Sequence, residues 1–344
     1  MRIVPEALID EWFPRILISS QVTKRARVAE FIAKAQSGYA APAIMFTATE
    51  AVTIAGRHFA ILSRDAGLIP DSVHTLGRHE WHQLFFGITR SSLHPKAGAP
   101  PLVVANSGHK SYYHWTLESI GALLMRRLLG QTGPLVMPPL TERWQTDLRE
   151  LFRIEEPVIE VAPNELAAFD EVALTNLTGR SYSFGPHPAL LQEFVRQAPS
   201  IGKTDGPKRI YISRFDVPGR RRMENEKSLC DLLRTRGFSI IDTGSLSVIE
   251  QAILFRGAEV IVAPHGAGLT NLIYACDGAL GPQVIELIHE GYLARGFLKI
   301  AQAKALNYMA IVNVDATIGD YHHDGTWRCD LDLVSQTLSE LAIH

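Results

Sequence analysis

Residues that could bind an anion follow an apolar segment near position 260. Residues 260–263 are apolar and mostly β-branched, which predicts a buried strand, and Pro264 ends it. His265, Gly266 and Gly268 form the following turn, and an apolar helical pattern comes next. Glycines let the backbone approach a ligand closely, and free N–H groups at a helix N-terminus favour phosphate. The turn therefore predicts an anion site. A tight turn around a packed histidine is the alternative, because Gly-x-Gly alone is a weak signal.

Arginines follow a second expected strand. That strand ends at Ser213 and Arg214, and Arg221 and Arg222 lie in the loop after it. Arginine binds phosphate through a planar, bidentate fork. Alone, these residues would indicate a solvated basic loop. Ligands of open α/β sheets bind at the carboxyl edge of the strands, so we expect the arginines to meet the glycine turn at that edge.

His114 and Glu118 are the candidate acid–base pair. They stand four residues apart on an expected helix that begins at Ser111, so they share one face. A carboxylate beside an imidazole raises its basicity and orients it. We therefore predict that His114 is a general base oriented by Glu118. A structural His–Glu pair is the alternative, and His109 is the competing base.

Further residues are candidate contacts of the same anionic ligand. His265 would contact a diphosphate or sugar, or it would hold the glycine turn in shape. Ala267 would offer its backbone amide, together with those of the two glycines. Asn271 would touch the ligand or cap the helix. Glu286 ends an expected strand, where a carboxylate commonly binds ribose hydroxyls, and pairing with an arginine is its alternative.

The elements that must position these residues alternate between strand and helix, which predicts an α/β fold with parallel βαβ units. Residues 199–207 form a polar linker between two regions. In the first region, the expected elements are short β-like runs at 43–46, 52–54 and 58–62, strands 101–105, 135–137 and 158–161, and helices 111–129, 141–152 and 188–197. In the second, they are strands 209–213, 239–242, 260–263, 283–288 and 308–314 and helices 225–236, 248–255, 269–275, 294–305 and 330–342.

Several motifs resemble glycosyltransferase family 61, which includes bacterial capsular-polysaccharide biosynthesis proteins. They are Tyr-Ile-Ser-Arg at 211–214, Pro-His-Gly-Ala-Gly-Leu-Thr-Asn-Leu at 264–272 and Tyr-Tyr-His-Trp-Thr-Leu-Glu-Ser at 112–119. The resemblance implies a GT-B fold, with two Rossmann-like domains facing a cleft. We expect an acceptor-side domain at 1–198, a nucleotide-sugar-binding domain at 199–329 and a terminal helix at 330–344 that packs back across the linker.

The resemblance also implies an activity. It is that of an inverting glycosyltransferase, a hexosyl- or pentosyltransferase that moves a sugar from a nucleotide sugar to a glycan or lipid-linked saccharide in cell-surface polysaccharide synthesis. An inactive glycan-binding or scaffold protein of the same fold is the alternative. A nucleotide-dependent oxidoreductase fits less well, because the Gly-x-Gly has no third glycine at the required spacing and follows a middle strand.

We expect no metal and no cofactor. GT-B enzymes usually stabilise the leaving diphosphate with arginine, lysine and helix N-termini. The Asp-x-Asp at 330–332 lies in the last expected helix, remote from the motif loops. His322, His323 and Asp324 read as a surface loop, because adjacent histidines point in different directions.

Composition limits the partners and the compartment. The 344 residues carry a net charge of −2, which gives no general attraction to nucleic acid or anionic membrane. The three cysteines lack the close spacing of a disulfide framework or zinc site, which fits a reducing cytoplasm. Charged residues and prolines interrupt residues 3–18, so we expect no secretory signal, and no apolar run is long enough to span a membrane. Peripheral association with the inner membrane, through the acceptor, is left open.

Overall fold

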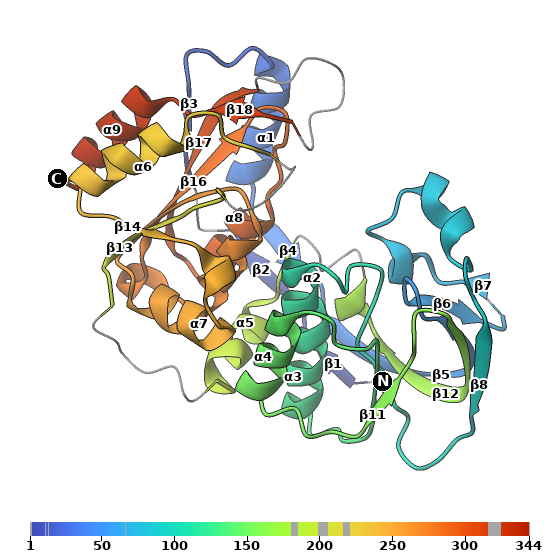
Figure 1. Cartoon of the computed structure of the whole chain (residues 1–344). Helices are drawn as coiled ribbons and strands as arrows, with labels where there is room; N and C mark the ends of the chain where they lie inside the picture. Colours follow the sequence, from blue (N-terminus) through green and yellow to red (C-terminus); the bar gives the residue numbers. More distant parts are fainter. Residues whose placement is uncertain are drawn as a thin grey trace. The chain divides into compact units, whose positions relative to one another are not determined.

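The chain folds as two compact α/β units in the computed structural model (Figure 1). Unit 1 comprises Met1–Leu8 and Ala40–Pro199, and unit 2 comprises Ile9–Tyr39 and Ser200–His344. The structure describes residues 2–10, 12, 14–65, 67–179, 185–198, 206–215, 221–315 and 325–343. The last division lies between residues 199 and 200, one residue after the expected boundary at 198/199. The sequence placed Ile9–Tyr39 in the first domain, whereas these residues belong to unit 2.

Unit 2 is built on a parallel sheet with the expected five strands. They lie in the order β14 (Ser239–Ile241), β13 (Arg209–Ile212), β15 (Val260–Pro264), β16 (Gln283–His289) and β17 (Asn307–Asp315). In chain order this is 2-1-3-4-5, the order of a flavodoxin-like doubly wound sheet. The order reverses between β13 and β15, and ligands of such folds bind outside the carboxyl ends of the strands at this reversal.

Helices cover both faces of this sheet (Figure 1). On one face, α6 (Glu226–Thr235) lies beside α9 (Leu331–Glu340). On the other lie α7 (Val248–Gly257) and α8 (Gly296–Ala303). Each of these helices was expected from its apolar periodicity, with ends that differ by one or two residues.

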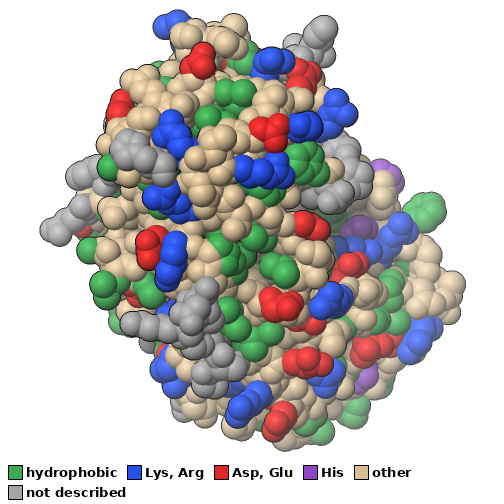
Figure 2. Space-filling view, turned by 60° about the vertical axis from the view of Figure 1, so that its left-hand side comes forward, with side chains coloured by type: hydrophobic (Ala, Val, Ile, Leu, Met, Phe, Trp, Pro, Cys, Tyr) green, Lys and Arg blue, Asp and Glu red, His purple; other side chains and the backbone are tan. Residues whose placement is uncertain are grey.

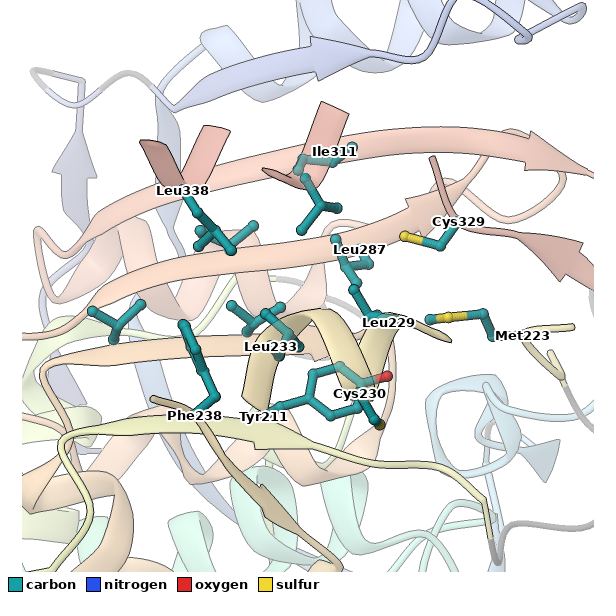
Figure 3. Packing of buried hydrophobic residues seen from close by; sticks show 14 of the residues in the cluster. Tyr211, Met223, Leu229, Cys230, Leu233, Phe238, Leu287, Ile311, Cys329 and Leu338 are labelled. Carbon is teal, nitrogen blue, oxygen red and sulfur yellow. The ribbon is translucent and has the colours of Figure 1, made fainter. Parts of the chain in front are cut away.

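The terminal helix α9 packs inside unit 2. Leu229 and Leu233 of α6 share an apolar cluster with Leu338 of α9 and with Leu287 and Ile311 of the sheet (Figure 3). Arg236, which follows α6, donates to the carbonyl oxygen of Ile343 at 2.9 Å. The sequence predicted a helix packing back across the linker. Within unit 2, its apolar face completes the cover over the β16–β17 side of the sheet, and packing across the linker stays a prediction.

Residues from the start of the chain complete the other edge of unit 2. β3 (Arg15–Ile18) pairs in parallel with β17, and α1 (Arg25–Gln36) follows it. Glu290, which is fully buried, accepts hydrogen bonds from the N–H groups of Thr23 and Lys24 at the start of α1. A carboxylate at a helix N-terminus satisfies unpaired donors and complements the helix dipole. These contacts explain why the segment folds with unit 2.

Unit 1 contains a mixed, nine-stranded sheet. Its main path runs β11 (Val158–Glu160), β10 (Leu135–Met137), β9 (Leu102–Val103), β12 (Glu165–Thr175), β5 (Ile44–Ala55), β6 (Ala60–Ser63) and β7 (Gly67–Leu68), while β1 (Arg2–Val4) pairs with β5 and β8 (Arg90–His94) with β12. β9, β10 and β11 have the parallel pairing expected of a Rossmann-like unit, and β12 also pairs in parallel with β8 and, through Ala173, with β9. β5 and β12 form a long antiparallel pair. The sequence split β5 into short runs and missed β12 and β8.

Three helical stretches accompany the parallel part of unit 1. They are residues 112–128, α4 (Arg143–Leu151) and α5 (Pro188–Arg196). The first was expected as one helix, and it contains a π-helical stretch, Trp115–Ile120, between α2 (Tyr112–His114) and α3 (Gly121–Leu128). π-helical turns are frequent at functional sites. Outside the two units' own sheets, β2 (Ala7–Ile9) pairs with β4 (Tyr39–Ala41).

The surface shows mixed charge. On the face drawn in Figure 2, basic and acidic side chains are interspersed among apolar ones. This agrees with the small net charge of −2. Within the described ranges, the helices all fall short of the length and apolarity that crossing a bilayer requires.

Candidate functional site

The carboxyl ends of β13 and β15 bring an arginine against the glycine turn. The backbone N–H of Arg214 donates to Glu226 Oε1 at 2.7 Å, and the hydroxyl of Tyr211 donates to the same oxygen at 2.9 Å. These bonds fix the end of β13. The Arg214 guanidinium then reaches Gly266, where an added Cβ would lie 2.2 Å from Nη1. Glycine is therefore required at 266 for this close approach.

A second guanidinium stands beside the first. Arg221 lies over the ring of Tyr292, with 4.8 Å between the guanidinium carbon and the ring centroid. Burial, reinforced by the positive charge of Arg221, lowers the pKa of Arg214 to about 10. Two cations held near one another at a strand end favour a polyanionic ligand such as a diphosphate. The structure thus brings Arg214, Arg221 and Gly266 together, whereas the Arg222 side chain is exposed.

The turn after β15 continues as a 3₁₀-helix, η6 (Ala267–Tyr274), where an α-helix was expected. Its first N–H groups have no partner within the helix, which leaves the backbone of Ala267 and Gly268 as donors. Asn271 is fully buried, and its amide donates to Gln251 Oε1 of α7 at 2.7 Å. This bond braces η6 against α7, and the expected contact between Asn271 and a ligand stays a prediction.

His265 and Glu286 form a buried pair behind the turn. His265 Nδ1 lies 2.5 Å from Glu286 Oε1, and the Tyr308 hydroxyl donates to the other carboxylate oxygen. Glu286 is 1% exposed. Each oxygen of Glu286 thus has a protein partner, and its predicted contact with ribose stays a prediction. For His265, this pairing supports the alternative reading, a histidine that holds the glycine turn in shape, and leaves only Nε2 for a ligand.

In unit 1, His114 and Glu118 form the expected pair. His114 Nδ1 lies 2.7 Å from Glu118 Oε1. A carboxylate only accepts, so Nδ1 carries the proton and the neutral ring presents its lone pair at Nε2. The Glu118 side chain is 1% exposed and that of His114 is 19% exposed. The geometry matches a general base oriented by a carboxylate.

A third residue, His74, joins this pair. Its Nε2 lies 3.6 Å from Glu118 Oε2, and the Asn106 amide donates to the same oxygen at 2.6 Å. Burial would raise the pKa of Glu118, but the charges of His114 and His74 and their hydrogen bonds outweigh it and lower the pKa to about 2. Glu118 is therefore ionised throughout the physiological range.

His109, the competing base, is enclosed. It is 6% exposed, and burial lowers its pKa to about 4. Its Nδ1 lies 2.9 Å from the carbonyl oxygen of Asn106. Its neighbour Gly108 packs against the His114 side chain, with 2.8 Å between an added Cβ and His114 Cβ. His109 thus supports the loop beneath His114.

Residues 112–280 match a family model. The family is Glycosyltransferase 61. The match covers just under half of the chain and supports membership of this family. It therefore also supports glycosyltransferase activity, which uses a sugar donor and an acceptor. It begins at α2, next to His114, and extends beyond η6, so it includes His114 and Glu118 of one cluster and Arg214, Arg221 and His265 of the other. A search of curated proteins found no match.

Two parts of this candidate glycosyltransferase site were not evident in the sequence. His74 precedes the family match and lies forty residues before His114, in a region without a recognisable motif. Tyr292, which supports Arg221, is a lone aromatic residue beyond the match. Neither has a spacing signal, because both reach their partners only through tertiary folding.

Two groups of residues have side chains of the kind that bind metal ions. The predicted surface loop His322-His323-Asp324 lies outside the described residues. Among described residues, the donor atoms of His74, His114 and Glu118 lie within 4.8 Å of one another, a spacing at which a cation could be shared. In the arrangement above, hydrogen bonds already link His114 to the carboxylate and His74 to backbone.

Proposed function

We propose that this chain is an inverting glycosyltransferase of the GT-B type. It would transfer a hexosyl or pentosyl group from a nucleotide sugar to a glycan or lipid-linked saccharide, in cell-surface polysaccharide synthesis of the bacterial capsular type. The observation that carries the proposal is the approach of Arg214 to Gly266 beside Arg221, at the strand-order reversal of a doubly wound sheet. The family match supports the same reaction class.

In this reaction, unit 2 holds the donor. Arg214 and Arg221 bind the diphosphate and stabilise its charge as the bond between the anomeric carbon and the phosphate oxygen breaks. The N–H groups of Ala267 and Gly268 add neutral donors. We infer that these groups make a metal ion or cofactor unnecessary.

Unit 1 supplies the base. Nε2 of His114 takes the proton of the acceptor hydroxyl while the acceptor oxygen bonds to the anomeric carbon from the face opposite the leaving group. Glu118 holds the ring through Nδ1 and stabilises the imidazolium that forms. The GT-B arrangement, with donor and acceptor units facing a cleft, is part of the proposal. So is action in the cytoplasm, with membrane contact made through a lipid-linked acceptor.

Nucleotide binding tests the donor site directly. Titration calorimetry with a panel of nucleoside diphosphates should identify one that binds the wild-type protein. Arg214→Ala and Arg221→Ala should each weaken that binding roughly 10- to 150-fold, because a lost charge-assisted contact costs about 1.5–3 kcal/mol. Arg234→Ala is the matched control, since Arg234 pairs with Asp231 on the exposed side of α6. Unchanged affinity in both site variants would contradict the assignment.

Turnover completes the test. The purified protein should transfer sugar to a saccharide acceptor from a nucleotide sugar that contains the nucleoside identified by calorimetry. NMR should show inversion at the anomeric carbon. Nucleotide binding without transfer or donor hydrolysis across the panel would instead support the inactive, glycan-binding alternative.

A further inference from the structure

Two imidazoles share the buried carboxylate of Glu118. His114 donates to one oxygen and His74 faces the other. We propose that His74 is a positioning residue that stays protonated, neutralises Glu118 and so keeps His114 neutral and able to accept a proton. The proposal rests on the proposed function only where it concerns catalysis.

The protons of His74 follow from its neighbours. Nδ1 lies 2.8 Å from the carbonyl oxygen of Asp71, which can only accept, so Nδ1 carries a hydrogen. Nε2 faces a carboxylate oxygen 3.6 Å away. A bare lone pair there would repel the carboxylate, whereas an N–H is attracted to it. Both nitrogens are therefore protonated and the ring is a cation.

Burial and charge agree with this assignment. The His74 side chain is 4% exposed, and burial alone would lower its pKa. The interaction with the Glu118 carboxylate, together with the carbonyl and carboxylate of Asp71, outweighs burial and raises the pKa of His74. A buried cation persists where it is paired with a carboxylate.

The consequence concerns His114. A carboxylate without a counter-charge would hold a proton on the adjacent imidazole and fill the Nε2 lone pair. With His74 charged, Glu118 still orients the His114 ring but attracts its second proton less. The rings of His74 and His114 lie edge to face, with centroids 5.6 Å apart, so a positive charge on one also disfavours a charge on the other.

The groups that face the imidazoles of His74 and His114 come from four places in unit 1. Asp71 lies on η1 (Pro70–Val73), Glu118 on the π-helical stretch and Asn106 on the loop after β9. Tyr113 of α2 packs edge-on against His114, with centroids 5.2 Å apart. The carboxylates of Glu118 and Asp71 both raise the pKa of His74 and so favour a cation there.

The test replaces His74 by glutamine, which keeps a hydrogen-bond donor and removes the charge. In His74→Gln, the NMR titration midpoint of His114 should rise by about one pH unit, as expected when a neighbouring like charge is lost. The acid limb of the pH–rate profile should move upward by the same amount, with the high-pH plateau within about threefold of wild type.

His82→Gln is the matched control. His82 also places Nδ1 against a carbonyl oxygen three residues earlier, that of His79, but it lies on the exposed η2 (Arg78–Gln83). The His82→Gln variant should leave the NMR titration midpoint of His114 unchanged. All titrations are run in EDTA so that only protons compete for the rings.

The outcomes separate the two proposals. An unchanged His114 midpoint in His74→Gln would overturn the role of His74. A raised midpoint without any change in the pH–rate profile would leave the charge pairing intact and contradict His114 as the base. Should the variant fail to fold, ¹⁵N NMR of the wild-type protein at pH 7.5 decides, since a neutral His74 would refute the proposal.

Discussion

At the residue scale, His114 and His265 make the same bond and serve different purposes. Each places Nδ1 against a buried glutamate. Glu286 is also held by Tyr308, and the His265 ring packs against Phe297 with centroids 4.8 Å apart. That environment makes a rigid brace behind the glycine turn. The partly exposed His114 ring, with Nε2 unbonded among the described residues, is suited to proton transfer.

The catalytic assignment of His114 gives the first prediction. His114→Ala should lower kcat by about 10²–10⁴, because a positioned general base contributes that factor. Donor affinity, set in unit 2, should stay near the wild-type value. Steady-state kinetics and nucleotide calorimetry measure the two effects separately. A variant with near-normal kcat would require a different base.

Glu118 links the site to stability. Its pKa falls from 4.5 to about 2 on folding, so its charge stabilises the native state above pH 4.5, and this stabilisation disappears as the pH falls toward 2. Glu118→Gln should reduce the free energy of unfolding by about 3–5 kcal/mol at neutral pH, because it leaves a buried cation unpaired. Urea unfolding across this range should show the gap to wild type narrowing between pH 4.5 and 2. A constant gap would argue against the ionised carboxylate.

At the element scale, the sequence predicted the bounds of strands best where the strands are buried on both faces of the sheet. β13, β15 and β16 were predicted within one residue, because continuous apolar runs flanked by turns mark central parallel strands. β5 was split and β12 missed, since these long strands are half exposed and carry polar residues. The His114–Glu118 pair was predictable from its helical spacing, whereas His265–Glu286 and His74 depend on how distant elements meet.

The contact between β13 and the glycine turn gives an element-scale prediction. Gly266→Ala would push its methyl against the far end of the flexible Arg214 side chain, so the guanidinium should move while the backbone stays. Donor affinity should fall roughly tenfold, or about 1.4 kcal/mol. In an Arg214→Ala background the same substitution should have little further effect. Calorimetry on this double-mutant cycle tests the contact, and additive losses would contradict it.

At the scale of the whole molecule, the proposed function assigns the two parts of one reaction to two separately packed units. The cationic site lies in unit 2 and the histidine network in unit 1. A family match that begins in one unit and ends in the other supports treating them as one enzyme. Removing one arginine of the cationic site should therefore affect donor binding alone. Removing one member of the histidine network should affect proton transfer alone.

Metal removal tests the whole reaction. We expect turnover to persist after dialysis against EDTA, because arginines and backbone amides supply the positive charge that a metal would otherwise provide. Sugar transfer measured before and after dialysis gives the result. Complete loss of activity, restored by Mn²⁺, would show the prediction to be wrong and return attention to His322, His323 and Asp324.

The start of the chain should be essential to unit 2. A protein from which residues 9–39 are deleted keeps β1 but lacks β3 and α1, which exposes the β17 edge and leaves buried Glu290 without its Thr23 and Lys24 donors. It should unfold at a lower temperature, bind nucleotide more weakly and aggregate. A synthetic peptide of residues 9–39 should restore both properties in trans. Equal melting temperatures for the two proteins would contradict this expectation.

The pairing of β3 with β17 also imposes an order in time. Arg15 leaves the ribosome 294 residues before its partner Met309 (309 − 15). At roughly 5–20 residues per second, β3 waits about 15–60 s for the strand beside which it must lie. During that interval unit 1 can be completed while an apolar strand stays unpaired nearby. Synthesis of this protein is therefore expected to depend on chaperones that shield its first forty residues, and a slower ribosome should lower the yield of folded enzyme.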